Sequence, residues 1–232
     1  MSDAHTPFDF EQARFNMIEQ QIRPWEVLDA AVLGLLAEVK REDFVPAAFR
    51  SVALADLEIP LCQPAVDGRC MLAPKVEARL LQDLALQPTD TVLHIGTGSG
   101  YLAALMGKQC ARVTSLEIDP ALARQARAHL QQAGIGNVDV KEADAAAQGF
   151  AACATGAPYQ VIVLDGSVAE VPPALLNLLA TGGRLWAVVG QEPVMRATLV
   201  RRTGPASFHT EQPWDTVAPR LVHFPEPSRF RF

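Results

Sequence analysis

A short apolar run that breaks into three glycines constrains the fold of this chain more than any other feature. Residues 91–95, Thr-Val-Leu-His-Ile, have the length and composition of a buried strand, and residues 101–106 are typical of a helix. Between them stand Gly96, Gly98 and Gly100. Glycine allows a positive φ and leaves room for a ligand beside the backbone, and a helix begins with unpaired N–H groups. The segment predicts a strand–turn–helix cradle of the nucleotide type, although a glycine triplet alone also suits a structural turn.

The chain after this unit alternates between strands and helices. Strands are predicted at residues 111–116, 138–140, 159–164 and 184–189, with helices at 120–133 and 172–179. This rhythm is typical of a parallel sheet with helices on both faces. No helix long enough for a crossover follows Gly190, so we expect antiparallel pairing of the segments 195–202, 207–212 and 220–224.

Two amphipathic helices precede the sheet. Apolar residues recur at helical spacing over residues 8–22, which Pro24 ends, and again over residues 27–39. Prolines and a glycine interrupt residues 41–68, and a further helix is predicted from Pro74 to residue 86. We expect residues 9–40 to pack over the ligand end of the sheet and to close the site from solvent.

The composition narrows the classes of protein to consider. The formal net charge of −6 argues against a protein that coats nucleic-acid phosphates. A run of about 18 apolar residues and a secretory leader pattern are both absent, so we expect a cytoplasmic protein with no membrane partner. The four cysteines form no C-x-x-C pair and the five histidines are scattered, which indicates free thiols and no metal.

Three candidate binding groups fall at the carboxyl ends of predicted strands, where open parallel sheets bind their ligands. They are the glycine turn of residues 96–100, Glu117 and Asp144. A carboxylate at Glu117 suits two ribose hydroxyls, and one at Asp144 suits an exocyclic adenine amine. Taken singly, Glu117 also suits a cap of the next helix, and Asp144 suits a turn. Their coincidence at successive strand ends favours ligand binding.

Several segments resemble one known family. Residues 92–101, Val-Leu-His-Ile-Gly-Thr-Gly-Ser-Gly-Tyr, resemble the nucleotide-binding motif of class I S-adenosylmethionine-dependent methyltransferases, specifically of protein-L-isoaspartate O-methyltransferases. Residues 17–23, 39–46 and 175–190 resemble other parts of that family. The resemblance implies an α/β fold of the Rossmann-like methyltransferase type. Its sheet is doubly wound, mostly parallel and seven-stranded, with an antiparallel C-terminal strand pair and an N-terminal helical cap.

The resemblance also implies a division of the chain, a cofactor and a substrate. Residues 1–73 would form the cap and substrate-side loops, and residues 74–232 the methyltransferase domain. Bound S-adenosylmethionine would methylate a carboxylate of isoaspartyl residues in damaged proteins or peptides, a repair step. Since a carboxylate is ionised at neutral pH, the transfer needs alignment rather than a general base, and no catalytic residue is assigned. The expected cofactor-binding residues are Gly96, Thr97, Gly98, Ser99, Gly100, Glu117, Ile118, Asp144 and Ala145.

The substrate segment departs from the family pattern. Where the family usually has Gly-Gln-Thr-Ile-Ser-x-Pro, residues 68–74 read Gly-Arg-Cys-Met-Leu-Ala-Pro. Cys70 and Leu72 therefore replace the hydroxyls expected at the substrate carboxylate, and Arg69 remains as a candidate clamp. Further along the chain, His94 replaces a usual acidic residue and Gln160 a common aspartate.

Two alternatives stay open from the sequence. One is a relative that binds the cofactor but has redirected or lost its methyltransferase activity. The other is an NAD-dependent dehydrogenase, which the glycine spacing and Glu117 also suit. The expected antiparallel tail, and the absence of a second domain for a hydride acceptor, favour the methyltransferase.

Overall fold

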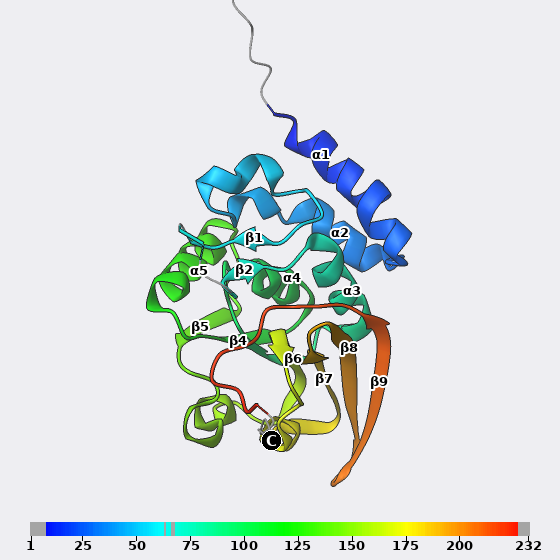
Figure 1. Cartoon of the computed structure of the whole chain (residues 1–232), viewed down its shortest axis with the longest axis vertical. Helices are drawn as coiled ribbons and strands as arrows, with labels where there is room; N and C mark the ends of the chain where they lie inside the picture. Colours follow the sequence, from blue (N-terminus) through cyan, green and yellow to red (C-terminus); the bar gives the residue numbers. More distant parts are fainter. Residues whose placement is uncertain (1–7, 63, 66–67, 227–232) are drawn as a thin grey trace, which may run out of the picture.

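A seven-stranded sheet runs through the centre of the molecule in a computed structural model that describes residues 8–62, 64–65 and 68–226 (Figure 1). The strand order is β5-β4-β3-β6-β7-β8-β9. Five strands are parallel: β3 (Thr91–Ile95), β4 (Arg112–Glu117), β5 (Val138–Glu142), β6 (Tyr159–Val168) and β7 (Leu179–Gln191). Two complete the sheet in antiparallel pairing: β8 (Val194–Gly204) and β9 (Ser207–Asp215). The predicted doubly wound sheet with an antiparallel end is confirmed.

The first strand of the parallel half stands where the winding direction changes. From β3 the chain moves outward to β4 and β5, then returns to place β6 on the opposite side of β3. Side chains of β3 alternate between the two faces: Val92 joins one core, and Leu93 and Ile95 join the other. The glycine turn after Ile95 therefore opens at the switch point, where open α/β sheets bind ligands.

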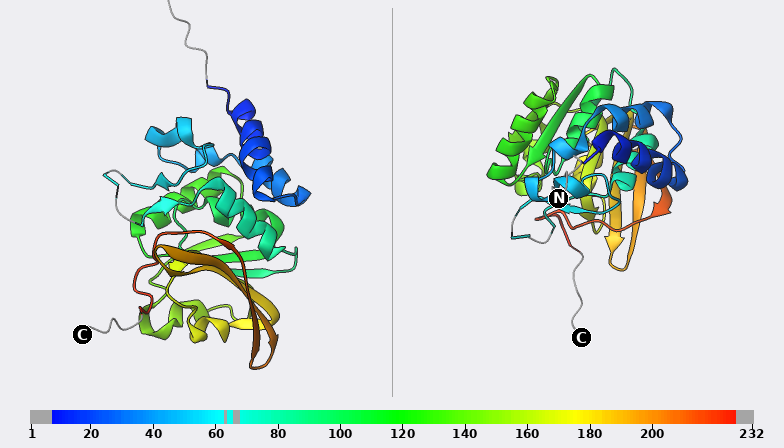
Figure 2. Two further views of the ribbon diagram at one scale, coloured as in Figure 1. Left: turned by 45° about the vertical axis from the view of Figure 1, so that its right-hand side comes forward. Right: turned by 90° about the horizontal axis from the view of Figure 1, so that it is seen from above.

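Helices cover both faces of the sheet (Figure 2). One face carries α3 (Pro74–Leu84), α4 (Tyr101–Gln109) and α5 (Pro120–Gln132). The other carries α6 (Pro173–Leu176) and the short turns η5 (Ala147–Gly149) and η6 (Ala151–Ala154). The helix predicted over residues 172–179 is thus a single turn, because β7 already begins at Leu179. Within the described ranges, no helix has the length and apolar character needed to cross a bilayer.

The N-terminal segment forms an outer layer on the helices of one face. It comprises α1 (Phe10–Met17), the π-helical η1 (Ile18–Ile22), η2 (Arg23–Trp25), α2 (Ala30–Glu38), η3 (Arg41–Asp43), η4 (Ala47–Val52) and a hairpin of β1 (Ile59–Pro60) and β2 (Cys70–Met71). Met17, Ile22 and Leu36 are buried in the same core as α3 and α4. Two buried ion pairs, Arg14–Glu42 and Arg41–Glu77, fix the layer further.

Residues 220–224 do not form the antiparallel strand that the sequence predicted. Their single bridge joins Arg220 to Ser167 and is parallel. Proline donates no N–H to a sheet ladder, and Pro219 and Pro225 flank the segment on both sides. The segment instead crosses the end of β6: the Ser167 N–H donates to the Pro219 carbonyl at 2.7 Å, and the Leu221 N–H to the Ser167 carbonyl at 2.9 Å.

Candidate functional site

A pocket of about 250 Å³ opens at the carboxyl ends of β3, β4, β5 and β6. Its walls come from the glycine turn, from the residues that follow β4 and β5, and from Asp165 in β6. Its roof comes from the β1–β2 hairpin and the C-terminal segment 220–224. The pocket thus collects strand-end groups in the way the sequence predicted. The hairpin belongs to the expected substrate-side loops, and the C-terminal segment 220–224 is a covering segment that the sequence did not predict.

The three glycines of the turn have different roles. Gly96, Gly98 and Gly100 have φ of 96°, 54° and 88°, conformations that favour glycine. Gly96 and Gly98 line the pocket. Gly100 lies behind it against α5, where an added Cβ would be 3.2 Å from the Cβ of Ala126. The third glycine therefore permits helix packing rather than the approach of a ligand.

The polar side chains between the glycines face the protein interior. The Thr97 hydroxyl is 2.6 Å from that of Ser115, and the Ser99 hydroxyl accepts from the Tyr101 N–H at 3.3 Å. Both residues are buried and neither lines the pocket. Any contact of Thr97 or Ser99 with a ligand must therefore come from backbone atoms, contrary to a role for their hydroxyls.

Glu117 joins the end of β4 to the glycine turn. One of its oxygens accepts from the Gly98 N–H at 2.8 Å and the other from the Asp119 N–H at 2.9 Å. Burial raises the pKa of the Glu117 carboxyl, and the two N–H groups oppose this rise without cancelling it. The cap of α5 is Asp119, which accepts from the N–H groups of Ala121 and Leu122. The alternative of Glu117 as a helix cap is therefore wrong. Glu117 lines the pocket, and each of its oxygens keeps acceptor capacity beyond its one N–H partner.

The residues after β5 form the far end of the pocket. Asp144 accepts from the Ala146 N–H at 3.0 Å through Oδ1, and its Oδ2 lies 2.7 Å from Nδ1 of His223. It is thus a turn residue and a pocket residue at once. Ile118, 39 % exposed, and the buried Ala145 add apolar surface beside it. An aromatic ring with a polar edge suits these surroundings.

The substrate segment differs most from expectation. Leu72 is only 3 % exposed, lies in the core, and does not line the pocket, so its predicted place at a substrate carboxylate is wrong. The pairing of β2 with β1 and the bond from Arg41 Nη2 to the Leu72 carbonyl, 2.7 Å, hold this part of the chain against α3. A buried position leaves no room for a substrate group.

Arg69 and Cys70 do line the pocket, but each already has a partner. The Arg69 guanidinium forms an ion pair with Asp119. The Cys70 thiol lies 3.5 Å from Oε2 of Glu58, and burial together with Glu58 raises its pKa to about 12. A substrate carboxylate would have to compete with Asp119 for Arg69, and would meet a protonated thiol at Cys70.

The N-terminal helices do not cover the pocket. No residue in the range 9–40 lines it. α2 and η1 pack against α3, α2 also packs against α4, and α1 packs on α2 and η1. The expectation that this layer closes the site is therefore wrong. The hairpin residue Leu61 and the residues Leu221 and Val222 occupy that position instead.

Gln160 and His94, the two residues of the sheet that differ from the family pattern, lie in different environments. Gln160 lies at the opposite end of the strands, where its Oε1 accepts from the N–H and the hydroxyl of Thr91 at 3.0 and 2.6 Å. His94 is fully buried beside the pocket, with Nδ1 2.9 Å from Oγ of Ser115 and Nε2 3.5 Å from Oδ2 of Asp165. The sequence did not lead to a prediction for Asp165. It directly follows the predicted strand 159–164, just as Glu117 directly follows the predicted strand 111–116.

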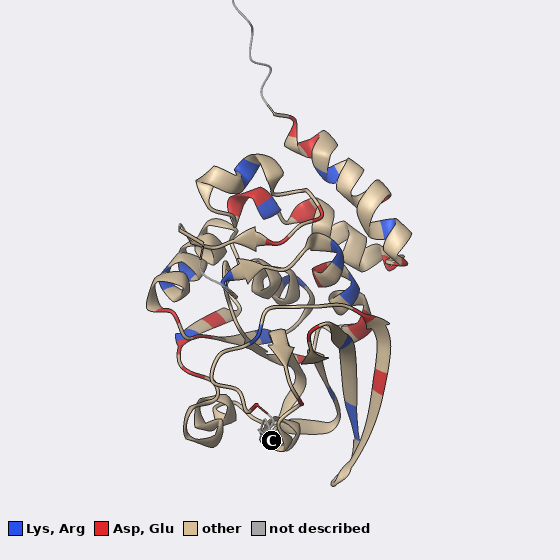
Figure 3. Ribbon diagram, viewed as in Figure 1, with Lys and Arg blue, Asp and Glu red and all other residues tan. Residues whose placement is uncertain are grey.

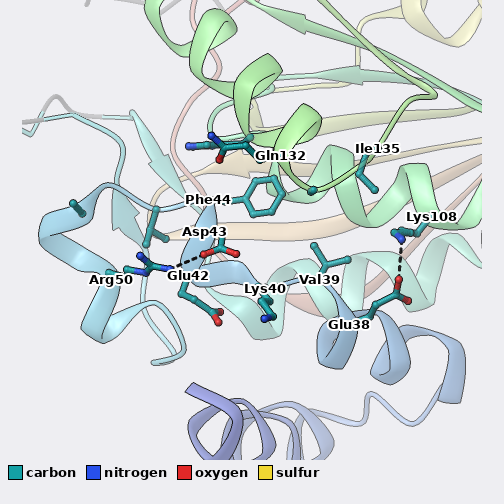
Figure 4. Close-up of a pocket in the computed structure, with 14 residues that line it drawn as sticks. Glu38, Val39, Lys40, Glu42, Asp43, Phe44, Arg50, Lys108, Gln132 and Ile135 are labelled. Carbon is teal, nitrogen blue, oxygen red and sulfur yellow. Dashed lines mark hydrogen bonds and ion pairs between the residues drawn. The ribbon is translucent and has the colours of Figure 1, made fainter. Parts of the chain in front are cut away.

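A second pocket of about 440 Å³ lies between the η3–η4 segment and α5 (Figure 4). Two ion pairs lie within its lining: Glu38 with Lys108 at 2.8 Å, and Asp43 with Arg50 at 2.7 Å. Lys and Arg are likewise interspersed with Asp and Glu over the helices and strands of the molecule (Figure 3). This pocket contains no strand-end carboxylate, so the pocket at the switch point is the candidate site.

Comparison with known proteins is consistent across sequence and structure. The family model described as Protein-L-isoaspartate(D-aspartate) O-methyltransferase matches residues 12–217. A protein-L-isoaspartate O-methyltransferase of Koribacter versatilis is 38% identical over 199 residues, which cover 85% of this chain and 84% of that protein. One of Methylorubrum populi is 37% identical over 202 residues, covering 86% and 90%.

A solved structure has the same fold. A Plasmodium falciparum chain described as a protein-L-isoaspartate O-methyltransferase in complex with S-adenosyl-L-homocysteine superposes with a TM-score of 0.73. The superposition covers 91% of this chain and 97% of that one, at 18% identity. At this identity the likeness concerns the fold alone.

Proposed function

Because this chain belongs to the protein-L-isoaspartate O-methyltransferase family, we propose that it binds S-adenosylmethionine in the pocket at the switch point and methylates a carboxylate of isoaspartyl residues in damaged proteins or peptides. The family consists of methyltransferases, and the dehydrogenase alternative has no support. Bound S-adenosylmethionine would supply an activated methyl group: an acceptor carboxylate oxygen forms a bond to the methyl carbon as the carbon–sulfur bond breaks, and S-adenosylhomocysteine leaves as a neutral thioether.

The residues of the pocket fit this cofactor. Glu117 is the observation that carries the proposal: a buried carboxylate whose two oxygens each accept one backbone N–H retains lone pairs for two ribose hydroxyls. Ile118 and Ala145 would hold the adenine between apolar surfaces, and Asp144 would accept a hydrogen bond from its amine. Gly96 and Gly98 leave space at the wall for the amino-acid end.

Arg69 and Cys70 mark the substrate side of the pocket. Their loop roofs the site and excludes water from the transfer, so that alignment of the acceptor oxygen with the methyl group provides the rate. An isoaspartyl carboxylate takes the Arg69 guanidinium from Asp119, which keeps its bonds to the α5 N–H groups.

Three observations favour a second candidate function, a relative with redirected or lost methyltransferase activity. Leu72 is buried, Arg69 is neutralised by Asp119, and Cys70 lies beside Glu58. This substrate side offers an anionic acceptor little free positive charge. Single-turnover assays with saturating S-adenosylmethionine separate the two candidates. Methylation of an isoaspartyl peptide but not of its aspartyl isomer supports the first, and absence of transfer from a protein with bound cofactor supports the second.

Calorimetric titration with S-adenosylhomocysteine and NAD tests the cofactor. We expect binding of the first and none of the second. Glu117→Gln should weaken binding by about 1.5 to 3 kcal/mol, roughly 10- to 150-fold, because a charged acceptor for the ribose hydroxyls is lost. Asp139→Asn is the matched control, since Asp139 is a half-exposed carboxylate of β5 outside the pocket. Equal affinities of a folded Glu117→Gln protein and the control would remove Glu117 from the ligand.

A further inference from the structure

A chain of polar side chains runs behind the pocket wall from the glycine turn to β6. The Thr97 hydroxyl lies 2.6 Å from that of Ser115, which lies 2.9 Å from Nδ1 of His94. His94 Nε2 lies 3.5 Å from Oδ2 of Asp165. His94 and Ser115 are fully buried, and Thr97 is nearly so. Of these four residues, only Asp165 lines the pocket.

One arrangement of protons pairs the Thr97 and Ser115 hydroxyls with Nδ1 of His94. The Thr97 hydroxyl donates to Ser115, and the Ser115 hydroxyl donates to Nδ1 of His94. The neutral imidazole then carries its hydrogen on Nε2, facing the Asp165 carboxylate. In the structure Nε2 forms no hydrogen bond, and its contact with the Asp165 carboxylate is a close approach of 3.5 Å.

Asp165 has acceptor capacity that the protein leaves unused. Its Oδ1 is buried and has no hydrogen-bond partner among the described residues. Among the residues that the structure describes, the single ion-pair contact of Asp165 is the one with His94. A carboxylate withdrawn from water without a cation costs free energy, which a cationic ligand group offsets.

The position of Asp165 indicates which part of a ligand it meets. A Cβ added to Gly96 would lie 3.1 Å from the Asp165 carbonyl and 3.5 Å from its Cβ, so Asp165 stands beside the first glycine. Glu117, Ile118 and Asp144 belong to the β4 and β5 side of the same pocket. With the nucleoside on that side, the amino-acid end of the cofactor extends to Asp165.

We propose that Asp165, which lies beside His94 in the pocket wall, binds the cationic amino-acid end of S-adenosylmethionine. In this chain β6 would then supply the carboxylate that the family usually carries at position 94 in β3. The inference rests on the proposed cofactor. Both cationic groups of the cofactor, the ammonium and the sulfonium, have the required chemistry. S-adenosylhomocysteine keeps only the ammonium, and 5′-methylthioadenosine has neither.

Calorimetric titration of these three compounds tests the assignment. Asp165→Asn should weaken S-adenosylhomocysteine about tenfold or more and leave methylthioadenosine unchanged, because only the former has the ammonium. A larger loss for S-adenosylmethionine than for S-adenosylhomocysteine would identify the sulfonium as a contact. Asp139→Asn should change none of the three affinities. In the double variant His94→Asp/Asp165→Asn, a carboxylate at position 94 should restore part of the S-adenosylhomocysteine affinity.

Two results would overturn the inference. One is equal weakening of S-adenosylhomocysteine and methylthioadenosine by Asp165→Asn, which indicates general damage to the pocket. The other is unchanged affinity for all three compounds in that variant. A wild-type protein that binds none of the compounds would instead contradict the proposed function, so the two failures are distinguishable.

Discussion

Leu72 shows how one side chain can change the meaning of a motif. It occupies the position where the family usually has a serine, yet it is 3 % exposed and packed in the main core with Met71 and Val76. The backbone carbonyl of the same residue accepts from Arg41, which also binds the Ala53 carbonyl and Glu77. In this chain, position 72 therefore contributes to stability rather than to substrate binding.

Leu72→Ser should destabilise the protein and should not accelerate methyl transfer. Removal of a buried leucine side chain leaves a cavity and adds an unsatisfied hydroxyl, at a cost of roughly 3 kcal/mol. Urea unfolding measures this loss. Leu57→Ser is the control, since Leu57 is 40 % exposed and its replacement should change stability by less than about 0.5 kcal/mol. Wild-type stability together with faster transfer would show that residue 72 reaches the substrate.

The turn between β3 and α4 combines two requirements in one short element. Its first two glycines keep the pocket wall open, and the third lets α4 begin close to α5. The element is tied to β4 through the bonds of Glu117 and through Ser115 behind it. Its shape thus depends on helix packing as well as on a ligand.

Gly100→Ala and Gly134→Ala form a matched pair that separates strain from packing. Both glycines have positive φ, 88° and 68°, so an alanine costs about 1 kcal/mol of backbone strain at either position. Only at Gly100 does the new Cβ meet a neighbour, Ala126 at 3.2 Å, whereas nothing lies within 4 Å at Gly134. We expect Gly100→Ala to cost roughly 1 to 3 kcal/mol more in urea unfolding. Equal losses would mean that α5 adjusts freely.

The molecule has a single main core across the division at residue 73. Met17, Leu36 and Phe44 share one cluster of buried residues with Leu80 and Tyr101. We therefore propose that residues 1–73 and 74–232 differ in topology but fold as one cooperative unit. In this arrangement the N-terminal helices support α3 and α4, and coverage of the pocket is left to the hairpin and the C-terminal segment.

Hydrogen exchange should show this distribution of roles. At short exchange times, when local opening dominates, S-adenosylhomocysteine should slow exchange in residues 68–71 and 220–224, because a ligand under the roof restrains these segments. Residues 10–17 of α1 should exchange at the same rate with and without ligand. Residues 204–207, at the turn between β8 and β9, provide a second unaffected region. Protection of α1 as strong as that of the roof would restore a closing role for the N-terminal layer.

Features that depend on local sequence patterns could be predicted from the sequence, and features that depend on contacts between distant residues could not. The strand at residues 91–95 and the positions of Glu117 and Asp144 depend on local patterns, and the sequence predicted them. The Arg69–Asp119 pair joins residues fifty positions apart, and the roof segment 220–224 depends on contacts with β6. No local pattern encodes such contacts. Asp165 is different, because the strand-end rule that selected Glu117 applies to it equally.

The C-terminal segment that crosses the end of β6 has a consequence for synthesis on the ribosome. Contributions to the pocket come from Leu61, residues 68–70, Gly96, Gly98, residues 116–119, Leu122, residues 143–145 and Asp165, and then from residues 220–222 and Phe224. A nascent chain can bury most of its core before that last contribution has left the exit tunnel, since domains form progressively during translation. The pocket remains without part of its roof until then. Newly made protein therefore gains its full affinity for a ligand only after residues 220–224 have left the tunnel.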